Sequence, residues 1–407
     1  MAPFFLVTVA SVTDGGDQRG PRGQSGTRAG GAGGRIAFYY AAVFVGPGVT
    51  LPFLPAFLAS RGLDPAEVAI ALTAQQFARL LSGPLIGRAA DAMGDRRRIA
   101  ALSAAAGVLA ALAVLMSSGP LALVLACGLA GAVTAPLVPL GDAVALRAAG
   151  LGLCDFGRVR GLGSIAFVLA TLAGGVAVRH LGAGIVPLAM AGGFAATVAA
   201  ALRLPAIETP PARGRGLGAA LLRRPGFALL LLASGLIQGS HALHYGFSVL
   251  AWASAGIGPD LSGLLWTVGV TGEIALLLFG RASATRIGPV GLLAVGAGAG
   301  IVRWVVTALS VDPWIIGPLQ LLHALSFGAT MLGAASLLVR LVPPELGATA
   351  QTLHAALGPG LVTMLLTAAS GPLYARFGGA AFLAMACVCA AALIPTALLA
   401  RRGEARS

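Results

Sequence analysis

The chain contains repeated apolar runs of about 20 residues or more, and these runs restrict its fold more than any other feature. Of its 407 residues, 57% are hydrophobic and only 10% are charged, far fewer charges than a soluble domain carries. Because lipid offers backbone amides no hydrogen-bond partner, a bundle of helices is the expected structure. We predict an all-α membrane protein with twelve transmembrane helices, at residues 36–59, 66–90, 97–116, 119–147, 156–179, 183–203, 225–256, 260–282, 289–309, 313–340, 345–375 and 379–400.

The basic residues are distributed unevenly between the two ends of these helices. All 27 are arginine and, with the N-terminus inside, 22 of them lie on the cytoplasmic side. Arg61, Arg179 and Arg376 lie on the opposite side, whereas Arg79 and Arg303 lie within helices. Cytoplasmic loops retain positive charge, so we expect a multi-pass inner-membrane protein with both termini in the cytoplasm. The same distribution explains the net charge of +13 without a nucleic-acid partner.

A segment rich in proline, arginine and glycine divides the predicted helices into two sets of six. We expect residues 204–222 to be a cytoplasmic linker between an N-terminal bundle, 35–203, and a C-terminal bundle, 223–402. The halves share short motifs, since LIGRAADAMG at 85–94 is echoed by LFGRASATRIG at 278–288. Internal repeats of this kind place a substrate site between the halves, near the middle of the membrane.

The two ends of the chain are predicted to lie outside these bundles. Residues 1–34 include a stretch rich in glycine and arginine that cannot bury a hydrophobic core. We therefore expect a disordered tail, or sequence that precedes the true start of the protein. Residues 403–407 form a short C-terminal tail.

A charged turn, GRAADAMGDRRR at 87–98, connects the second and third predicted helices. Gly87 would allow two helices to approach closely, and Gly94 would allow a tight turn. Asp91 can accept hydrogen bonds from arginines or from the first amides of a neighbouring helix. The basic residues that follow are Arg96, Arg97 and Arg98. The alternative is that the arginines serve only to keep this loop in the cytoplasm.

Two opposite charges fall at matching depths in the two halves, Arg79 on the second helix and Glu273 on the eighth. A charge in the bilayer core costs about 2.5–3.5 kcal/mol and usually faces protein or a water-filled cavity. We expect Arg79 to attract an anionic substrate and Glu273 to carry a proton, with Gln75 as a further candidate contact. A fixed structural pairing of Glu273 with Arg303 is the alternative.

Four of the five histidines fall within predicted helices of the second half. His241 and His244 share one face of the seventh helix with Tyr245 beside them, and His323 and His354 lie on the tenth and eleventh helices. Imidazole titrates near physiological pH, so these residues are candidates for proton coupling or substrate contact. Hydrogen bonding between helices is the alternative. Two histidines alone make a poor metal site, and we predict neither a metal nor a cofactor.

Asp142 and Arg160 are predicted to meet at the cytoplasmic ends of the fourth and fifth helices. They would form either a gate pair or a solvated cluster at the helix ends. The sequence carries no nucleophile elbow and no phosphate-binding glycine loop with a lysine, so we do not expect an enzyme.

The pattern G-x-x-x-D-x-x-G followed by arginines, at residues 87–98, resembles the loop between helices 2 and 3 of the major facilitator superfamily of transporters. The resemblance implies that Asp91 is the carboxylate of a latch that holds the two halves together in an outward-open state. The arginines at 96–98 would be its basic flank.

Longer stretches resemble the phenylpropionate permease branch of this superfamily, proton symporters proposed to import aromatic acids. The resemblance covers nearly all of residues 36–400. The chain departs from it at Phe156, where tyrosine is expected, and at Gly161–Leu162, where Leu-Trp is expected. The stretches that carry the resemblance include FARLLSGPLIG, PLGDAVALR, FGRVRGLGSIAF, GSHALHYGF, LLWTVGVTGEI, IVRW, LQLLHALSFGA and AQTLHAAL.

The resemblance and the charges within the membrane together predict a monomeric secondary transporter whose partners are a small-molecule substrate, protons and the lipid bilayer. Its expected function is proton-coupled uptake of a small organic acid, with an aromatic acid as the candidate. Efflux of an amphipathic drug or metabolite is an alternative, because orientation does not fix the direction of transport. A non-transporting membrane receptor or scaffold is an alternative from another class.

Overall fold

The computed structural model describes residues 26–93, 95–207, 218–343 and 346–402. These residues are almost entirely helical and include no strand. Within them, ten helices or runs of helices are long and apolar enough to cross a membrane. The predicted all-α membrane class is therefore confirmed, whereas the count of twelve spans stays a prediction.

The difference between the ten candidate spans of the structure and the twelve spans predicted from the sequence has two sources. Helix α2 (Pro65–Met93) is 29 residues long but is not one of the ten apolar spans, because polar and charged residues such as Glu67 and Arg79 interrupt it. The last span, Thr349–Arg401, is counted once although it holds two long helices. Between them lies Gly378, whose φ of 53° favours glycine and turns the chain.

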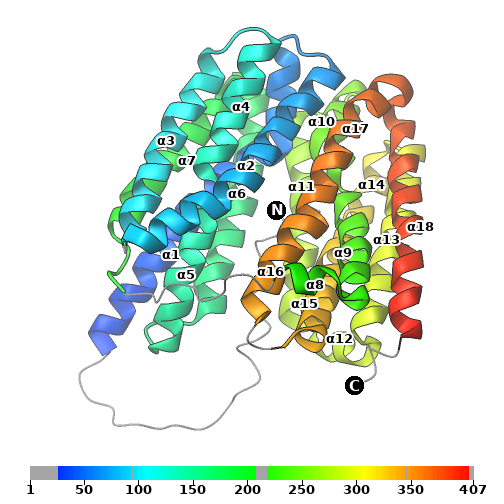
Figure 1. Ribbon diagram of the computed structural model, residues 1–407. Coiled ribbons are helices and arrows are strands. Elements are labelled where there is room, and N and C mark those ends of the chain that lie inside the picture. Colours follow the sequence, from blue (N-terminus) through cyan, green and yellow to red (C-terminus); the bar gives the residue numbers. More distant parts are fainter. Residues whose placement is uncertain (1–25, 94, 208–217, 344–345, 403–407) are drawn as a thin grey trace. The chain divides into compact units, whose positions relative to one another are not determined.

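The chain folds as two compact units. The N-terminal unit holds the described residues of 26–62 and 74–207, and the C-terminal unit holds 63–73 and the described residues from 218 onward. Helix α2 thus contributes residues to both units. The sequence prediction instead places all of α2 in the N-terminal bundle, 35–203. The other helices of the N-terminal unit are α1 (Gly26–Ser60), α3 (Arg96–Met116), α4 (Pro120–Thr134), α5 (Leu137–Gly150), α6 (Phe156–Leu181) and α7 (Ile185–Leu202) (Figure 1). Among them, α1 packs most extensively against α6 and α7, and α3 packs against α7.

The C-terminal unit contains shorter helical segments, because several of its long helices are interrupted. Its elements are α8 (Gly218–Leu222), α9 (Pro225–Gly239), α10 (Ala242–Ser254), α11 (Pro259–Phe279), α12 (Arg281–Ile287), α13 (Pro289–Leu309), α14 (Pro313–Leu319), η2 (Ala324–Ala329), α15 (Thr330–Leu341), α16 (Gly347–Ala355), η4 (Ala356–Gly360), α17 (Leu361–Phe377), η5 (Gly378–Ala381) and α18 (Phe382–Arg401) (Figure 1). Helix α13 packs against α18, α15 and the π-helical segment η2, and α9 packs against α18.

Several segments differ from the sequence prediction. Helix α1 begins at Gly26, so residues 26–34 are helical rather than part of the tail, and α8 lies inside the predicted linker 204–222. The predicted helix 225–256 is interrupted between α9 and α10. At this break the Ser240 hydroxyl donates to Ile237 O at 2.7 Å, a side-chain bond that competes with the helical ladder.

Helix starts follow local chemistry that can be read from the sequence. Proline, which lacks an N–H and has a preset φ, occupies the start of α4, α9, α11, α13 and α14. Asp95 and Asp155 cap α3 and α6 by accepting hydrogen bonds from Arg98 N at 3.1 Å and Arg158 N at 2.7 Å.

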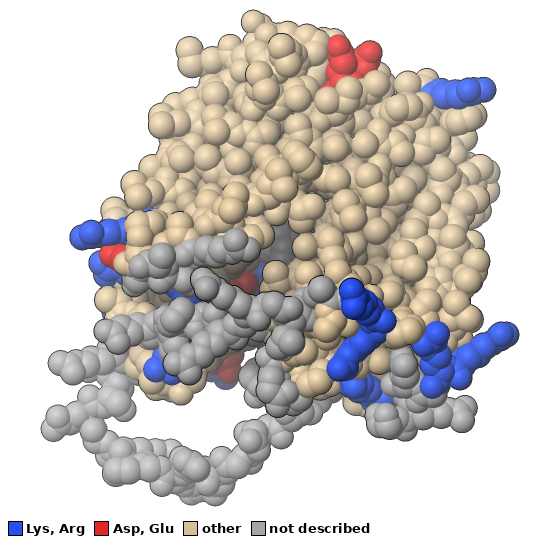
Figure 2. Space-filling model, viewed as in Figure 1, with Lys and Arg blue, Asp and Glu red and all other residues tan. Residues whose placement is uncertain are grey.

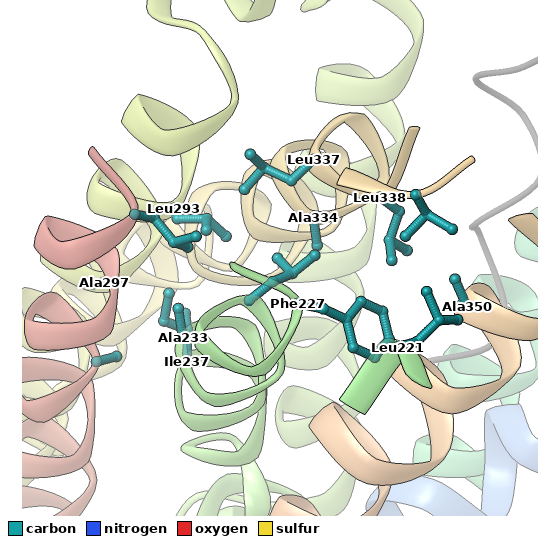
Figure 3. Close-up of a cluster of buried hydrophobic side chains, with 14 residues drawn as sticks. Leu221, Phe227, Ala233, Ile237, Leu293, Ala297, Ala334, Leu337, Leu338 and Ala350 are labelled. Atoms are coloured by element: carbon teal, nitrogen blue, oxygen red, sulfur yellow. The ribbon is translucent and has the colours of Figure 1, made fainter. Parts of the chain in front are cut away.

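A buried apolar cluster holds the C-terminal unit together, and Figure 3 shows its side chains converging from several helices. Phe227 and Ile237 on α9 belong to it together with Leu293 on α13 and Leu337 on α15. Alanines such as Ala233 contribute small side chains that let the helices approach closely. This packing fixes α9 and α13, two helices that flank the polar residues described below.

The charged side chains of the C-terminal unit are concentrated at helix ends, and the flank in view is largely uncharged (Figure 2). Exposed leucines such as Leu264, Leu278 and Leu321 are the kind of surface that lipid tails contact. The exposed arginines of α8, α12, α15 and α18 lie at or near the ends of these helices, at Arg223, Arg286, Arg340 and Arg401. This is the distribution expected of a membrane-spanning unit.

Gly131 on α4 is a position where a single methyl group is expected to disturb the packing. A Cβ there would lie 2.8 Å from the Gln75 carbonyl carbon of α2 and closer still to its oxygen. Gly131→Ala is expected to destabilise the protein by about 1–3 kcal/mol through overpacking, measured as a lower melting temperature in detergent. Gly192→Ala is the matched control, because a Cβ at that position would meet no other atom within 4 Å. Equal melting temperatures for the two variants would contradict this packing.

Candidate functional site

Among the described residues of the C-terminal unit, the most buried charged side chain is Arg303 on α13, which is 1% exposed. Its guanidinium donates to Gln320 Oε1 at 2.8 Å and to His323 Nδ1 at 3.1 Å, and it lies 3.5 Å from His244 Nε2. It also stacks over the Trp304 ring at 4.5 Å. Gln320 is held in place by a second bond, from its Nε2 to Ile316 O at 3.0 Å. Three different helical segments therefore converge on one permanent positive charge.

His323 connects Arg303 to Glu273 on α11. Its Nε2 lies 3.5 Å from Glu273 Oε2, and both side chains are buried. Because a guanidinium can only donate, His323 Nδ1 must accept, and the proton of a neutral ring must then sit on Nε2, facing the carboxylate. The structure therefore contains a continuous chain from Arg303 through His323 to Glu273. The role of Glu273 as a proton carrier, and the alternative of a fixed structural pairing with Arg303, stay predictions.

Aromatic rings enclose this chain on the α10 side. His244 stacks on Trp266 with centroids 4.8 Å apart, and His241 lies edge-on to Trp304 and His323. The break between α9 and α10 places His241 where its Nδ1 lies 3.1 Å from Gln238 O, and its Nε2 lies 3.1 Å from Ser326 Oγ of η2. π-Helical segments often occur at functional sites, and η2 follows His323 directly.

A small cavity lies at the centre of these residues, with about 10 Å³ of space, roughly what one water molecule needs. Tyr245 lines it, and its hydroxyl is a buried polar atom without a hydrogen-bond partner among the described residues. The same holds for Arg303 Nε. The lining residues are His244, Tyr245, Trp266, Gly269, Val270, Arg303, Gln320 and His323.

The remaining candidates for substrate or proton contact are not among the residues that line this cavity. His354 on α16 is buried in the same unit, where its Nε2 lies 2.8 Å from Ser234 Oγ of α9. Arg79 and Gln75 are half-buried on the part of α2 that belongs to the N-terminal unit. Gln75 packs its backbone against Gly131 of α4. The structure thus gathers His241, His244, Tyr245, Glu273 and His323 around Arg303, whereas His354 lies against Ser234 and Arg79 belongs to the other unit.

Asp142 and Arg160 meet in the N-terminal unit. Arg160 Nε lies 3.6 Å from Asp142 Oδ1, and the Tyr40 hydroxyl donates to the same oxygen at 2.6 Å. Arg160 is only 3% exposed and its guanidinium lies over the Phe44 ring at 4.4 Å. The geometry is that of a buried pair, so the solvated helix-end cluster is wrong, and a gate role stays a prediction.

The charged turn at 87–98 is described only in part. Gly94 and the side chain of Asp91 lie outside the described residues, so the latch carboxylate stays a prediction. Gly87 lies within α2 with open space around its Cβ position. Among the arginines, Arg96 opens α3, Arg97 donates to Leu204 O at 3.3 Å, and Arg98 pairs with Asp95 at 3.2 Å.

Sequence reasoning missed the tryptophans of the site. The chain has four, and Trp252, Trp266 and Trp304 are buried around the histidines, whereas Trp314 is 88% exposed. Tryptophan is enriched at membrane surfaces. Tryptophans inside predicted helices therefore indicate that these helices face a polar interior of the bundle. Trp266 Nε1 donates to Ser248 Oγ at 3.1 Å, and Trp304 Nε1 donates to Ser240 Oγ at 2.9 Å.

Comparison of most of the sequence with a family model and with known proteins shows what the chain is similar to. The model of the MFS_1-like family matches residues 35–384. A protein of Escherichia coli strain K12 named "Probable 3-phenylpropionic acid transporter" is 30% identical over 366 residues, which cover 87% of this chain and 94% of that protein. A maltose permease of Geobacillus stearothermophilus is 28% identical, over 89% of this chain and 93% of its own length.

Solved structures share the fold at lower identity. The nucleoside transporter NupG superposes with a TM-score of 0.77 at 17% identity, covering 91% of this chain and 98% of NupG. A bacterial homologue of the human lysosomal transporter Spinster superposes with a TM-score of 0.68 at 15% identity, covering 94% and 99% of the two chains. The chain therefore belongs to the MFS_1-like family and is a membrane transporter of the major facilitator superfamily.

Proposed function

We propose that the protein is a secondary transporter that couples the uptake of a small organic acid, with an aromatic monocarboxylate as the leading substrate, to the entry of a proton. The observation that carries the proposal is the buried chain Arg303–His323–Glu273. It combines a fixed cation, which attracts a carboxylate, with a carboxyl group that can take up and release a proton. The relative named for 3-phenylpropionic acid supports the choice of substrate class.

The proton is assigned to Glu273 rather than to His323. As long as Arg303 donates to His323 Nδ1, that nitrogen cannot also carry a proton, so the imidazole stays neutral. Glu273 Oε2 lies 3.5 Å from His323 Nε2, and a protonated carboxyl group still has an oxygen that can accept from that nitrogen. Glu273 can therefore change its charge without breaking the contact, whereas His323 cannot.

Arg79 is proposed to supply positive charge that draws the anion into the transporter, from the unit that does not contain Arg303. Gln75, His241, His244 and His354 are retained as substrate or proton contacts. The latch of Asp91 with Arg96–Arg98 and the gate pair Asp142–Arg160 are proposed to control the transition between outward-open and inward-open states. These roles follow from residue chemistry and from the family resemblance.

The topology of the proposal is twelve crossings of the inner membrane by a monomer, with both termini in the cytoplasm. Helix α2 and the separate crossings of α17 and α18 complete the set of twelve. Residues 204–222 link the bundles, and residues before α1 and after 402 form tails. Transport requires no nucleic-acid partner, cofactor or metal.

The proposal is tested by uptake into right-side-out membrane vesicles. Radiolabelled 3-phenylpropionate is added with an inwardly directed proton gradient, and again after a protonophore has collapsed it. We expect saturable accumulation that needs the gradient. Accumulation that appears only in inverted vesicles, or proton-driven export, would favour the efflux alternative.

Passive entry of the undissociated acid must be separated from carrier-mediated uptake. Counterflow does this, because vesicles preloaded with unlabelled acid accumulate label transiently only through a carrier. Vesicles that bind the acid but show no counterflow and no accumulation would overturn transport and favour a receptor.

A further inference from the structure

Arg303 and Tyr245 line the same cavity, and each carries a buried hydrogen-bond donor without a partner among the described residues. Arg303 has five N–H groups and directs three of them toward His323, Gln320 and His244, so two are left. One of these is on Nε, which is buried without a partner among the described residues. The Tyr245 hydroxyl lines the same cavity in the same condition. Buried polar atoms are normally satisfied, so donors left over in one cavity indicate a ligand that accepts.

The charge of the cavity selects the sign of that ligand. The acceptors in contact with Arg303 are an amide oxygen and two imidazole nitrogens, all of them uncharged when they accept. Glu273 Oε2 lies 3.5 Å from His323 Nε2. A guanidinium surrounded by neutral acceptors attracts an anion, and its planar N–H groups match the two oxygens of a carboxylate.

Part of the cavity lining is apolar and aromatic. Trp266, Gly269 and Val270 of α11 line the cavity together. The indole N–H of Trp266 is already satisfied by Ser248 Oγ at 3.1 Å, so the ring offers an apolar surface rather than a polar contact. A ligand that places its charge on Arg303 can therefore place a planar apolar group against Trp266.

We propose that this cavity is the subsite for the carboxylate of an aryl-substituted monocarboxylic acid, with Arg303 and Tyr245 donating to its oxygens and Trp266 contacting its ring. The inference rests on the proposed function and names the residues that set its specificity. The cavity in this conformation has room for about one water molecule, so both the carboxylate head and the ring require the helices around it to separate. We assign Tyr245 as the specificity-determining residue. Its hydroxyl makes no hydrogen bond within the described residues, so removal of this hydroxyl breaks no internal hydrogen bond there.

Tyr245→Phe tests the subsite with the ring size preserved. The full-length protein is titrated in detergent with 3-phenylpropionate, and KM and kcat are measured for uptake in proteoliposomes. Loss of one hydrogen bond to a charged group is expected to weaken binding about tenfold or more and to raise KM by the same factor, with kcat nearly unchanged. The affinity for the uncharged analogue 3-phenylpropanol should be the same in both proteins.

Tyr374→Phe is the matched control. Tyr374 is a tyrosine of α17 in the same unit that stacks on Phe247 at 4.8 Å and does not line the cavity. It should leave the affinity for 3-phenylpropionate unchanged. A Tyr245→Phe protein that binds and transports the acid like the wild type would overturn this inference and leave the proposed function standing. A wild-type protein that binds no carboxylate would overturn both.

Discussion

Replacement of Arg303 by alanine is expected to abolish uptake of the acid, and replacement by lysine is expected to reduce it about 100-fold. Lysine keeps the charge but has a single nitrogen, so it cannot reach His323, Gln320 and His244 together as the planar guanidinium does. Both the substrate subsite and the neutral state of His323 depend on these contacts. Initial uptake rates in proteoliposomes, normalised to the amount of reconstituted protein, measure the effect.

Arg286→Ala is the control for Arg303. Arg286 is an exposed arginine of α12 in the same unit, so its removal changes the net charge equally without touching the site. It should transport like the wild type. Size-exclusion profiles in detergent confirm that each variant is folded. If the folded Arg303→Ala protein transported at the wild-type rate, the buried chain Arg303–His323–Glu273 would have no part in transport.

Glu273→Gln is expected to separate exchange from net uptake. Glutamine has the shape of a protonated glutamate and keeps an oxygen that can accept from His323 Nε2. A carrier that is permanently in the protonated-like state can exchange internal for external acid but cannot release a proton. We therefore expect counterflow close to that of the wild type, with proton-driven accumulation lost and no dependence of uptake on the proton gradient.

Asp312→Asn is the control for Glu273. Asp312 is an exposed acid that caps α14 by accepting from Trp314 N at 2.9 Å, a role that asparagine also fills. It should leave both exchange and accumulation intact. Gradient-driven accumulation by the Glu273→Gln protein would place the proton on another group. Loss of counterflow together with accumulation would mean that Glu273 is needed for substrate binding rather than for coupling.

The positions of the helices could be predicted because the lengths of the apolar runs and the prolines at helix starts are local properties. Most predicted limits, such as 289–309 for α13, agree with the structure. The interruptions could not be predicted, because the break at Ser240 and the π-helical η2 lie inside segments whose length and overall hydropathy suit one continuous helix. The start of α1 at Gly26 was missed for the opposite reason, since a glycine-rich sequence gives no helical signal.

The members of the candidate site could be predicted, but their partners could not. Charged and imidazole side chains are costly inside a membrane, so Arg303, His323 and Glu273 stood out in the sequence. They lie on three different segments, and no spacing within one helix shows that His323 stands between the other two. Tyr245 was a candidate contact beside His244, and the unused donor it contributes is visible only in three dimensions.

Proton entry driven by the substrate itself tests the central claim most directly. Proteoliposomes that enclose a pH-sensitive dye receive external 3-phenylpropionate with no imposed gradient, and the initial rate of internal acidification is recorded against concentration. Coupled transport predicts a rate that saturates with the acid, exceeds that of protein-free vesicles and disappears with Arg303→Ala. Acidification that rises linearly with concentration, and is equal with and without the protein, would contradict proton-coupled transport of this acid.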